Sequence, residues 1–342
     1  MEAMKLTKKT VKTLETPYAI DLGNGFSKRM WKDKMSVDPS VFAVYNPTWS
    51  DAKVDIFEFE DGDPIIIGNH AKNLVKNVSQ AMVSESAERY SSKQFRQLFL
   101  STIAKDLRKS TRIPHLVTGL PVSHFNSRID QLESFKGEHT FLFNGEKIYI
   151  EIENVHVLPQ PLGTYFYTID EDIDTGDSVL VIDVGHGTLD ITELNGQAVV
   201  TDIGNDLGIK EAHNNVAALL REDFNDRTEF GSIGITEILE KGLKYKGSRI
   251  SIREKYEKQL RAIFRNHFDL ILAFITENKL DLTTYDNVIW TGGGSQELFD
   301  FIMNEEGNDN NHYIFIEEPQ TANIKGYFAF GQAKEDEFND TE

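Results

Sequence analysis

The order of apolar and polar residues predicts short strands joined by glycine turns in two separate stretches of the chain. Residues 18–23, YAIDLG, form the first predicted strand, with a second at 25–33 and a third at 36–45. Residues 178–204, SVLVIDVGHGTLDITELNGQAVVTDIG, predict three more strands with turns at glycines. Two strand-rich stretches with the same order of elements predict a duplicated α/β architecture with a cleft between its halves.

Helices are predicted where apolar residues recur at intervals of three and four. Between residues 91 and 110 the apolar positions have the spacing of one face of an amphipathic helix: Phe95, Leu98, Phe99, Ile103 and Leu107. Helical segments are also predicted over 210–279. The other predicted elements are a hairpin at 54–68, a short buried strand at 115–125, a strand, turn and helix start at 146–169, a strand, triple-glycine turn and helix at 285–302, and a strand at 312–318.

These elements divide the chain into segments. We expect a weakly ordered leader at 1–16, then a first lobe at 17–163 with a small inserted subdomain at about 32–92. A second lobe follows at 164–318, with a helical insertion at about 210–280. Residues 319–342 are expected to form a connector and a helix that returns to the first lobe, plus an acidic tail. With 342 residues, 39% of them hydrophobic, the chain is long enough for two lobes.

Charge and composition narrow the classes of partner. The formal net charge is -19, from 55 acidic and 36 basic side chains, and a field of that sign repels phosphate backbones. We therefore expect no direct contact with nucleic acid; the acidity serves either solubility or the attraction of a basic partner. There is no apolar run near the roughly 20 residues of a membrane span, no apolar core of a secretory signal and no cysteine for a disulfide. These features predict a cytoplasmic protein without membrane contact.

A recurring turn carries the candidate chemistry. In both strand-rich stretches an apolar strand ends in aspartate, and glycine stands at the second and fourth positions after it: Asp21, Gly23 and Gly25 in one, Asp183, Gly185 and Gly187 in the other. Glycine lets backbone N–H groups approach a ligand closely, and successive N–H groups form an anion-binding nest. A carboxylate beside such a turn can hold the hydrated Mg²⁺ of a polyphosphate. Ser27, Lys28 and Thr188 add hydroxyls and a cation.

One such turn is weak evidence, because Asp and Gly also serve ordinary hairpins. Two copies about 160 residues apart, with a third glycine turn at Gly292, Gly293 and Gly294, favour a nucleotide site. The chain lacks the P-loop pattern, and GNGFSK lacks the third glycine of the dinucleotide fingerprint. Neither a P-loop NTPase nor a Rossmann dehydrogenase fits.

The motifs together resemble the actin, Hsp70 and sugar-kinase ATPase superfamily. In chain order they are a first phosphate loop DLGNGFSK, a first connector LPQPLGTYF, a second phosphate loop DVGHGTLD, an adenosine loop TGGGSQEL and a second connector TANIKGYFAFG. Within the superfamily the chain is most similar to the bacterial actin-like plasmid-segregation proteins of the ParM type. The resemblance implies a duplicated actin-like, ribonuclease H-like fold of two lobes, with ATP and Mg²⁺ in the cleft between them.

The resemblance also implies residue roles. Asp21 would hold Mg²⁺ through water, Gly23, Asn24 and Gly25 would donate backbone N–H groups, and Lys28 would contact the phosphates. Asp183 would act on the metal from the opposite side, with Gly185, His186, Gly187 and Thr188 around the γ-phosphate. Gln160 matches the residue that orients the attacking water, Gly292 to Gly294 would lie by the α-phosphate and adenosine, and Lys210 and Glu211 would contact the ribose or adenine.

Some of these positions have a second interpretation. A loop histidine such as His186 is often only a polar surface group. Asp190 is either near the metal or a turn-stabilising carboxylate, and Asn323 is equally open. Ala322 and Gly326 suit close helix packing at a hinge.

Three functions follow from the resemblance. The first is an ATPase that polymerises into a helical filament and segregates plasmid DNA through a basic DNA-binding adaptor of the ParR type. The second is a small-molecule kinase acting on a sugar or carboxylate, and the third is a non-polymerising ATP-dependent scaffold. The sequence favours the filament, because no separate acid or base for an acceptor stands out and no long domain follows the ATPase core. The sequence does not distinguish ATP from GTP as the bound nucleotide.

Overall fold

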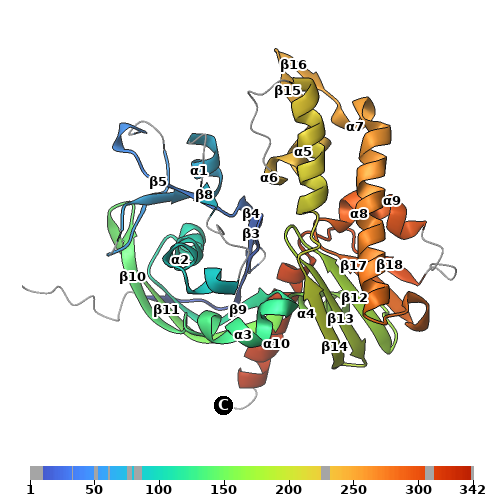
Figure 1. Ribbon diagram of the computed structural model, residues 1–342. Coiled ribbons are helices and arrows are strands. Elements are labelled where there is room, and N and C mark those ends of the chain that lie inside the picture. The colour runs from blue at the N-terminus through green and yellow to red at the C-terminus, as the bar shows by residue number, and fades with distance from the viewer. Residues whose placement is uncertain are drawn as a thin grey trace, which may run out of the picture. The chain divides into compact units, whose positions relative to one another are not determined.

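The computed structural model describes residues 11–32, 34–49, 53–60, 62–74, 79–80, 87–224, 232–304 and 312–339. The chain forms two compact units (Figure 1). Unit 1 takes Met1–Leu120, His124–Asp170 and Ile324–Glu342; unit 2 takes Pro121–Ser123 and Glu171–Asn323. The units divide at Asp170 and Asn323, whereas the sequence places these boundaries after residues 163 and 318.

Unit 1 is built on an eleven-stranded sheet of described strands. Its central part runs β4-β3-β2-β9-β11-β10, with β2 and β3 antiparallel and β2, β9 and β11 parallel. The strands are β1 Lys12–Thr13, β2 Tyr18–Leu22, β3 Phe26–Trp31, β4 Lys34–Pro39, β5 Val41–Val44, β6 Phe57–Glu58, β7 Ile65–Ile67, β8 Ser79–Gln80, β9 Thr111–Leu120, β10 Gly137–Phe143 and β11 Glu146–Pro159. Because β2 and β11 flank β9, their ends bring residues 21 and 160 to one edge of the sheet.

The helices of unit 1 include one buried among the strands and two that meet at glycines. Buried Phe95, Leu98 and Phe99 of α2 lie in one apolar core with strand residues such as Ile20 and Ile150. The helical elements are α1 Gly68–Leu74, α2 Lys93–Leu107, α4 Gln160–Asp170, most of α3 Val122–Glu133 and of α10 Ala322–Asn339, and the short turns η2 Pro47–Trp49 and η3 Ala87–Ser91. Helices α4 and α10 are so close that a Cβ on Gly326 would stand 1.7 Å from the carbonyl oxygen of Gly163.

A buried ion network anchors the first hairpin to α2. Arg29 on β3 is 2% exposed and contacts Asp106 with two nitrogens at 2.9 Å and Asp38 with a third at 2.9 Å. Lys105 also reaches Asp38, at 2.8 Å. Burial alone would raise the pKa of Asp38, but the hydrogen bond from Lys105 and the charge of Arg29 lower it overall. A paired buried network of this kind holds β3 in place next to the turn at residues 23–25.

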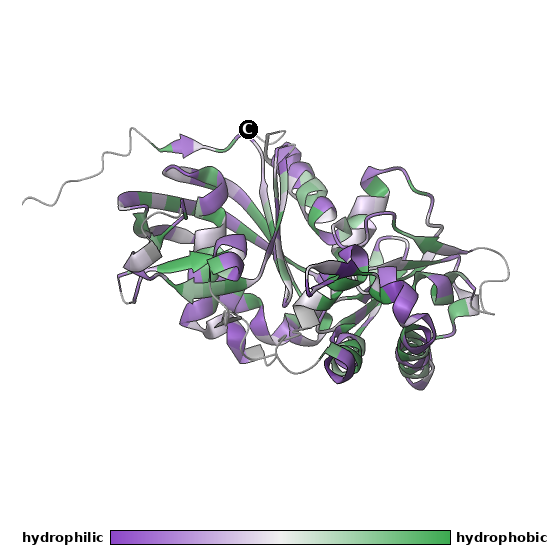
Figure 2. Cartoon of the chain, turned by 90° about the horizontal axis from the view of Figure 1, so that it is seen from above, coloured by the Kyte–Doolittle hydropathy of each residue, from purple (hydrophilic) through white to green (hydrophobic). Residues whose placement is uncertain are grey.

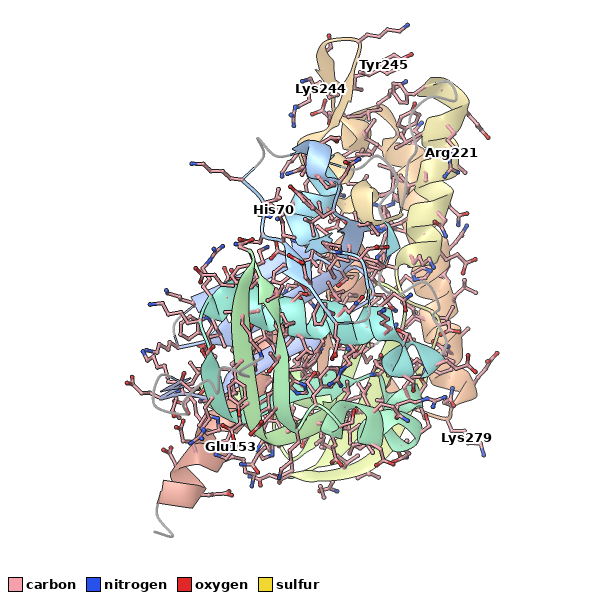
Figure 3. The ribbon with its side chains drawn as sticks, turned by 90° about the vertical axis from the view of Figure 1, so that its left-hand side faces the viewer. His70, Glu153, Arg221, Lys244, Tyr245 and Lys279 are labelled. Atoms are coloured by element: carbon pink, nitrogen blue, oxygen red, sulfur yellow. The ribbon has the colours of Figure 1, made fainter. Side chains whose placement is uncertain are left out.

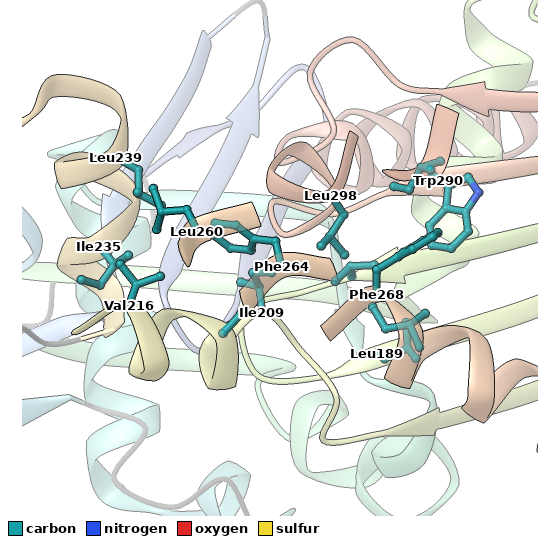
Figure 4. Close-up of a cluster of buried hydrophobic side chains, with 14 of the residues drawn as sticks. Leu189, Ile209, Val216, Ile235, Leu239, Leu260, Phe264, Phe268, Trp290 and Leu298 are labelled. Carbon is teal, nitrogen blue, oxygen red and sulfur yellow. The ribbon is translucent and has the colours of Figure 1, made fainter. Parts of the chain in front are cut away.

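Unit 2 is a five-stranded sheet in the order β14-β13-β12-β17-β18, covered by helices. Phe268 of α8 contacts Trp290 of β17 with ring centroids 5.8 Å apart, and the apolar cluster continues along α5, α6 and α9 (Figure 4). The elements are β12 Ser178–Val184, β13 Leu189–Asn195, β14 Ala198–Asn205, α5 Lys210–Phe224, α6 Ser232–Lys241, β15 Leu243–Tyr245, β16 Ser248–Ile250, α7 Ile252–Lys255, α8 Glu257–Glu277, η4 Leu282–Thr284, β17 Asn287–Thr291, α9 Ser295–Met303 and β18 Tyr313–Phe315. In Figure 2 the helices show both hydrophilic and hydrophobic colours along their length, as amphipathic helices do.

Most predicted elements are confirmed. The hairpins at 18–33 and 54–68, the helix at 93–107, the three strands from residue 178 and the strand-turn-helix at 285–302 are all present. The strand predicted at 36–45 is two strands, because Ser40 leaves the ladder and its N–H donates to the Gly25 carbonyl at 3.0 Å. The elements that were missed include α1, α3, β10 and the β15–β16 hairpin, which lies within the stretch predicted as helical. The predicted leader lies largely outside the described residues.

The substitution Gly326→Ala, which adds one methyl group, should destabilise unit 1. The new Cβ would overlap the Gly163 carbonyl, so α4 and α10 would have to separate, which costs about 1–3 kcal/mol or more. Gly234→Ala in α6 is the matched control, because a Cβ there meets nothing within 4 Å and alanine favours a helix by about 0.5–1 kcal/mol. Thermal unfolding should show a lower midpoint for Gly326→Ala and an equal or higher one for Gly234→Ala. Equal midpoints for Gly326→Ala and the unchanged chain would contradict the close crossing.

Candidate functional site

The first glycine turn presents a buried carboxylate. Asp21 ends β2 and is 2% exposed, and the turn after it is closed by the Gly23 N–H, which donates to the Phe26 carbonyl at 3.1 Å. Lys28 Nζ lies 2.7 Å from Asp21 Oδ2, and Gln160 Nε2 donates to Asp21 Oδ1 at 3.4 Å. Asp21, Lys28 and Gln160 therefore form one cluster, with Gly23, Asn24 and Gly25 in the turn beside it.

A second cation stands at this turn that the sequence did not reveal. Arg89 of η3 is 5% exposed, and its Nη1 donates to the side-chain oxygen of Asn24. Its Nη2 donates to the Tyr90 hydroxyl, and its Nε has no partner within the described part of the chain. Arg89 comes from a segment 65 positions further along the chain than Asn24, in no motif, so no local signal could identify it.

The second glycine turn repeats the arrangement in unit 2. Asp183 on β12 is 4% exposed, and the Gly185 N–H closes the turn by donating to the Thr188 carbonyl at 2.9 Å. Thr188 Oγ1 donates to Asp190 Oδ2 at 2.7 Å. The other oxygen of Asp190 accepts the Val122 N–H, also at 2.7 Å. Asp190 thus stabilises the turn and the start of α3. Of the two roles that the sequence allows for Asp190, these contacts agree with the turn-stabilising carboxylate.

The third glycine turn packs directly on Asp183. Gly292 has φ +84°, and a Cβ there would stand 2.1 Å from Asp183 Oδ1. The Gly294 N–H donates to the Val184 carbonyl at 2.8 Å, and a Cβ on Gly294 would meet Ile209 and Val184 at 2.8 Å. Strands β12 and β17 are parallel neighbours, so their carboxyl ends bring residues 183–188 and 292–294 to the same edge.

The first turn of α5 docks on the second loop. The Ile209 N–H donates to the Gly185 carbonyl at 3.0 Å, and the Lys210 N–H to the His186 carbonyl at 2.9 Å. A Cβ on Gly208 would lie 2.5 Å from the backbone of Gly187, which explains the glycine. Lys210 and Glu211 therefore lie in the first turn of a helix whose backbone is hydrogen-bonded to the second loop.

Each strand-end aspartate is held by an amide at the beginning of a helix. Gln160, the first residue of α4, donates to Asp21; Asn323 of α10 donates from Nδ2 to Asp183 Oδ2 at 2.6 Å. Both amides are followed three residues later by one of the crossing glycines, Gly163 and Gly326. This shared spacing is the signal in the sequence that would have assigned Asn323 to the site.

His186 lies against a second histidine. Its ring centroid is 5.9 Å from that of His213, which is buried at 1% exposure on α5. Burial, and then the neighbouring His213, lower the pKa of His186 to about 4. His186 is therefore neutral at physiological pH. It is partly buried, so it is not the exposed surface group that a loop histidine often is.

The residues of the site fall into two sets. Unit 1 holds Asp21, Gly23, Asn24, Gly25, Lys28 and Gln160, and unit 2 holds Asp183, Gly185, His186, Gly187, Thr188, Lys210, Glu211, Gly292, Gly293 and Gly294. Across the described residues, no three or more His, Asp or Glu side chains converge on a metal position. A single carboxylate at each loop suits a metal that keeps most of its waters, as Mg²⁺ does.

Comparisons with known proteins agree with this architecture. Residues 19–163 match the family model for the N-terminal domain of actin-like proteins. The archaeal actin homolog Ta0583, in its complex with ADP, matches with a TM-score of 0.73 at 19% identity. A ParM in a 15-stranded filament from Clostridium botulinum gives 0.72 at 22%, and a non-polymerisable quadruple mutant of pCBH ParM gives 0.69 at 24%. Each match covers 93% of this chain and 99% of the other. Comparison with curated protein sequences finds no significant match.

The chain therefore has the mixed α/β fold of actin-like proteins. The resemblance to actin-like proteins, drawn from the five motifs, is confirmed by the match of residues 19–163 to the N-terminal domain of that family, and the ParM structures share the fold.

The low pKa of His186 predicts a pH dependence of stability. The unfolded chain binds a proton at His186 near pH 6.5 and the folded chain only near pH 4, so the unfolded state binds more protons between these values. The free energy of unfolding should therefore fall as the pH is lowered through this window, by about 1–2 kcal/mol at pH 5 from this residue. Urea unfolding at pH 7 and pH 5 measures it.

His186→Gln is the comparison that isolates this contribution. Burial also lowers the pKa of other histidines, His115, His139, His156 and His267, and these contribute the same sign in both proteins. The variant should lose less stability than the unchanged chain between pH 7 and pH 5. Identical losses would show that His186 titrates alike in both states.

Proposed function

We propose that this protein binds and hydrolyses ATP with Mg²⁺ and assembles into filaments in an ATP-dependent way. The observation that carries the proposal is the duplicated arrangement at Asp21 and Asp183. Each is a buried strand-end carboxylate under a glycine turn and accepts a hydrogen bond from an amide on a following helix. Two equivalent half-sites in one chain suit one ligand with several negative charges, and we propose that both engage the same triphosphate.

The unit 1 half-site supplies positive charge. Lys28 is paired with Asp21 at 2.7 Å, and Arg89 is buried beside Asn24. We propose that both cations contact phosphate oxygens in the nucleotide complex, with Lys28 exchanging its carboxylate partner for phosphate. Mg²⁺, when bound with the nucleotide, neutralises charge on the phosphates. Asp21 and Asp183 would hold it through water, and Lys210 and Glu211 with the glycines of 292–294 would surround the nucleoside. The ADP complex of Ta0583, a protein with this fold, supports a nucleotide as ligand.

Hydrolysis in this site depends on positioning. Gln160 is held at the Asp21 carboxylate, and its amide can both donate to and accept from a water molecule. That water would attack the γ-phosphorus, forming one P–O bond as the bond to the β–γ bridging oxygen breaks, and its proton would pass to solvent or phosphate. The loop N–H groups and Lys28 stabilise the charge that develops.

Assembly is supported by the fold match to a ParM filament from Clostridium botulinum. We propose that the filament segregates plasmid DNA in the cytoplasm through a basic adaptor of the ParR type. The net charge of -19 fits a basic protein partner and disfavours direct DNA contact. None of the helices in the described ranges is both long and apolar enough to cross a membrane.

Replacing Asp183 by Asn tests the shared metal position. The change keeps the shape of the side chain and removes the charge, so phosphate release with ATP and Mg²⁺ should fall by about 10²-fold or more.

Light scattering and pelleting with ATP should show assembly in the unchanged protein and much less with ADP. Phosphate release that requires an added sugar or carboxylate would indicate a kinase instead, and nucleotide binding without assembly would indicate a scaffold.

Gln160→Ala should separate binding from hydrolysis. Without the amide the water is poorly placed, and we expect kcat to fall by about 10²-fold with little change in KM. Gln259→Ala, on the exposed side of α8, is the matched control and should leave both constants unchanged. A variant at residue 160 with full kcat would remove Gln160 from the mechanism.

A further inference from the structure

Three titratable side chains of unit 2 form a line that ends at the second glycine turn. His213 of α5 lies in the middle: its Nε2 is 3.4 Å from Glu297 Oε1 of α9, and its ring centroid is 5.9 Å from that of His186. His213 is 1% exposed and the side chain of Glu297 5%. The line therefore joins the helix after the third glycine turn, the first turn of α5 and the loop that carries His186.

The inner pair of this line, Glu297 and His213, is poorly suited to a structural role. The neighbours of His213 on α5, Ala212 and Val216, belong to the apolar core of unit 2. Among the described residues neither ring nitrogen of His213 has a hydrogen-bond partner. Moving a carboxylate and an imidazole out of water is costly, and one contact at 3.4 Å offsets little of that cost. Buried titratable groups that are kept beside a candidate site are typical of proton handling.

The other charges near His186 come from the elements packed around the second loop. They are Lys210 and Glu211 of α5, His267 of α8, and Asp183 and Asp190 of the strands β12 and β13. The His267 ring donates a hydrogen bond to the Leu207 carbonyl, and burial lowers its pKa. Burial, followed by the charge of His213, lowers the pKa of His186 to about 4. His186 is therefore neutral in the free chain and coupled to His213.

Helix α5 separates this line from the basic β15–β16 hairpin. Phe224, the last residue of α5, contacts Tyr245 with ring centroids 5.0 Å apart. Figure 3 shows Arg221 and Lys244 in the same part of unit 2, away from Lys279. The helix rises about 16 Å between His213 and Phe224, which exceeds the screening length of about 8–10 Å at physiological salt. Arg221 and Lys244 therefore contribute little to the electric field at His186.

We propose that His186 takes up a proton from solvent when a nucleoside triphosphate binds, and that the imidazolium then donates a hydrogen bond to a phosphate oxygen. Glu297 and His213 are positioning residues: they orient the ring, and the Glu297 carboxylate balances the added charge across His213. This rests on the proposed function, because the second loop must face the phosphates. The proton adds to a ring nitrogen and returns to solvent when the phosphate leaves, so no other reactant is required.

The charge of the phosphate supplies the driving force. A phosphate group carries about two negative charges at pH 7, and an opposite charge within about 4–6 Å raises proton affinity by about 10- to 10³-fold. His186, with a pKa of about 4 in the free chain, should then titrate near pH 6 or above in the complex. Because the complex binds more protons than the free chain, affinity for the triphosphate should rise at least about twofold from pH 8 to pH 6.

Calorimetric titration at pH 6 counts this proton. A non-hydrolysable ATP analogue with Mg²⁺ is titrated in buffers of different ionisation enthalpy, at protein concentrations below those that pellet. The dependence of the heat on the buffer gives the protons taken up per nucleotide. The unchanged chain should take up about half a proton or more beyond His186→Gln. The titration of the analogue itself is common to both proteins, so their difference removes it, and with ADP the two proteins should give equal counts.

Glu297→Gln tests the positioning residues. The change keeps the shape of the side chain and removes the balancing charge, so the proton count should fall toward that of His186→Gln. A purely structural role would lower the affinity equally at pH 6 and pH 8 and leave the count unchanged. His312→Gln is the matched control and should keep the full count. His312 is a partly buried histidine of the same unit, and its ring donates to the Leu282 carbonyl at 3.0 Å, at the start of β18.

The side-chain NMR signals of His186 read the same proton directly, and thermal unfolding checks that each variant is folded. With the analogue bound at pH 6, the ring should show the chemical shifts of an imidazolium, and without it those of a neutral imidazole. This measurement needs only the unchanged chain, with His186→Gln to assign the signals.

The outcomes separate this inference from the proposed function. If both proteins bind the analogue with equal proton counts, His186 takes up no proton, and the proposed ATP binding stands. An unchanged count for folded Glu297→Gln would contradict the role of Glu297 and His213. A larger count with ADP than with the triphosphate analogue would also overturn the inference. If the folded, unchanged chain takes up no nucleotide, both proposals fall.

Discussion

The arrangement of the second half-site depends on how closely three backbone segments approach one carboxylate. Gly292 leaves no room for a Cβ beside Asp183, since that atom would lie 2.1 Å from the carboxylate oxygen. Gly208 and Gly294 allow equally close contacts with the loop and with Val184. A side chain at any of the three would push the loops apart and release the aspartate from its position. The glycines are required here by space, and Asn323 then holds the other carboxylate oxygen.

The two halves of the chain hold their strand-end aspartates with similar residues. In each, a strand-end aspartate accepts a hydrogen bond from an amide at the beginning of a helix, and that helix carries a glycine three residues later. The glycines meet where α4 and α10 cross in unit 1, so the helices that carry the amides pack with almost no separation. In unit 1 Asp21 is also paired with the cation of Lys28, at 2.7 Å.

Sequence alone predicted what depends on local pattern. The strand-turn-strand repeats, the helix at 93–107 and the glycine turns have periodicities and residue types that few other structures share. Arg89 could not be found in this way, because its contact with Asn24 joins distant segments through packing of the inserted strands and turns. The β15–β16 hairpin was hidden in a polar stretch whose two three-residue strands are too short to show alternation. The position of Asn323 in the site could be predicted only by comparison with Gln160, because both amides precede a glycine by three residues. A single amide in a connector has many other roles.

The central claim is that both aspartates serve one nucleotide. Calorimetric titration with a non-hydrolysable ATP analogue and Mg²⁺ tests it most directly, using the unchanged chain, Asp21→Asn and Asp183→Asn. One site per chain is predicted, with its affinity lowered by either substitution. Two independent sites per chain, each sensitive to only one substitution, or the absence of any heat of binding from folded protein, would contradict the account.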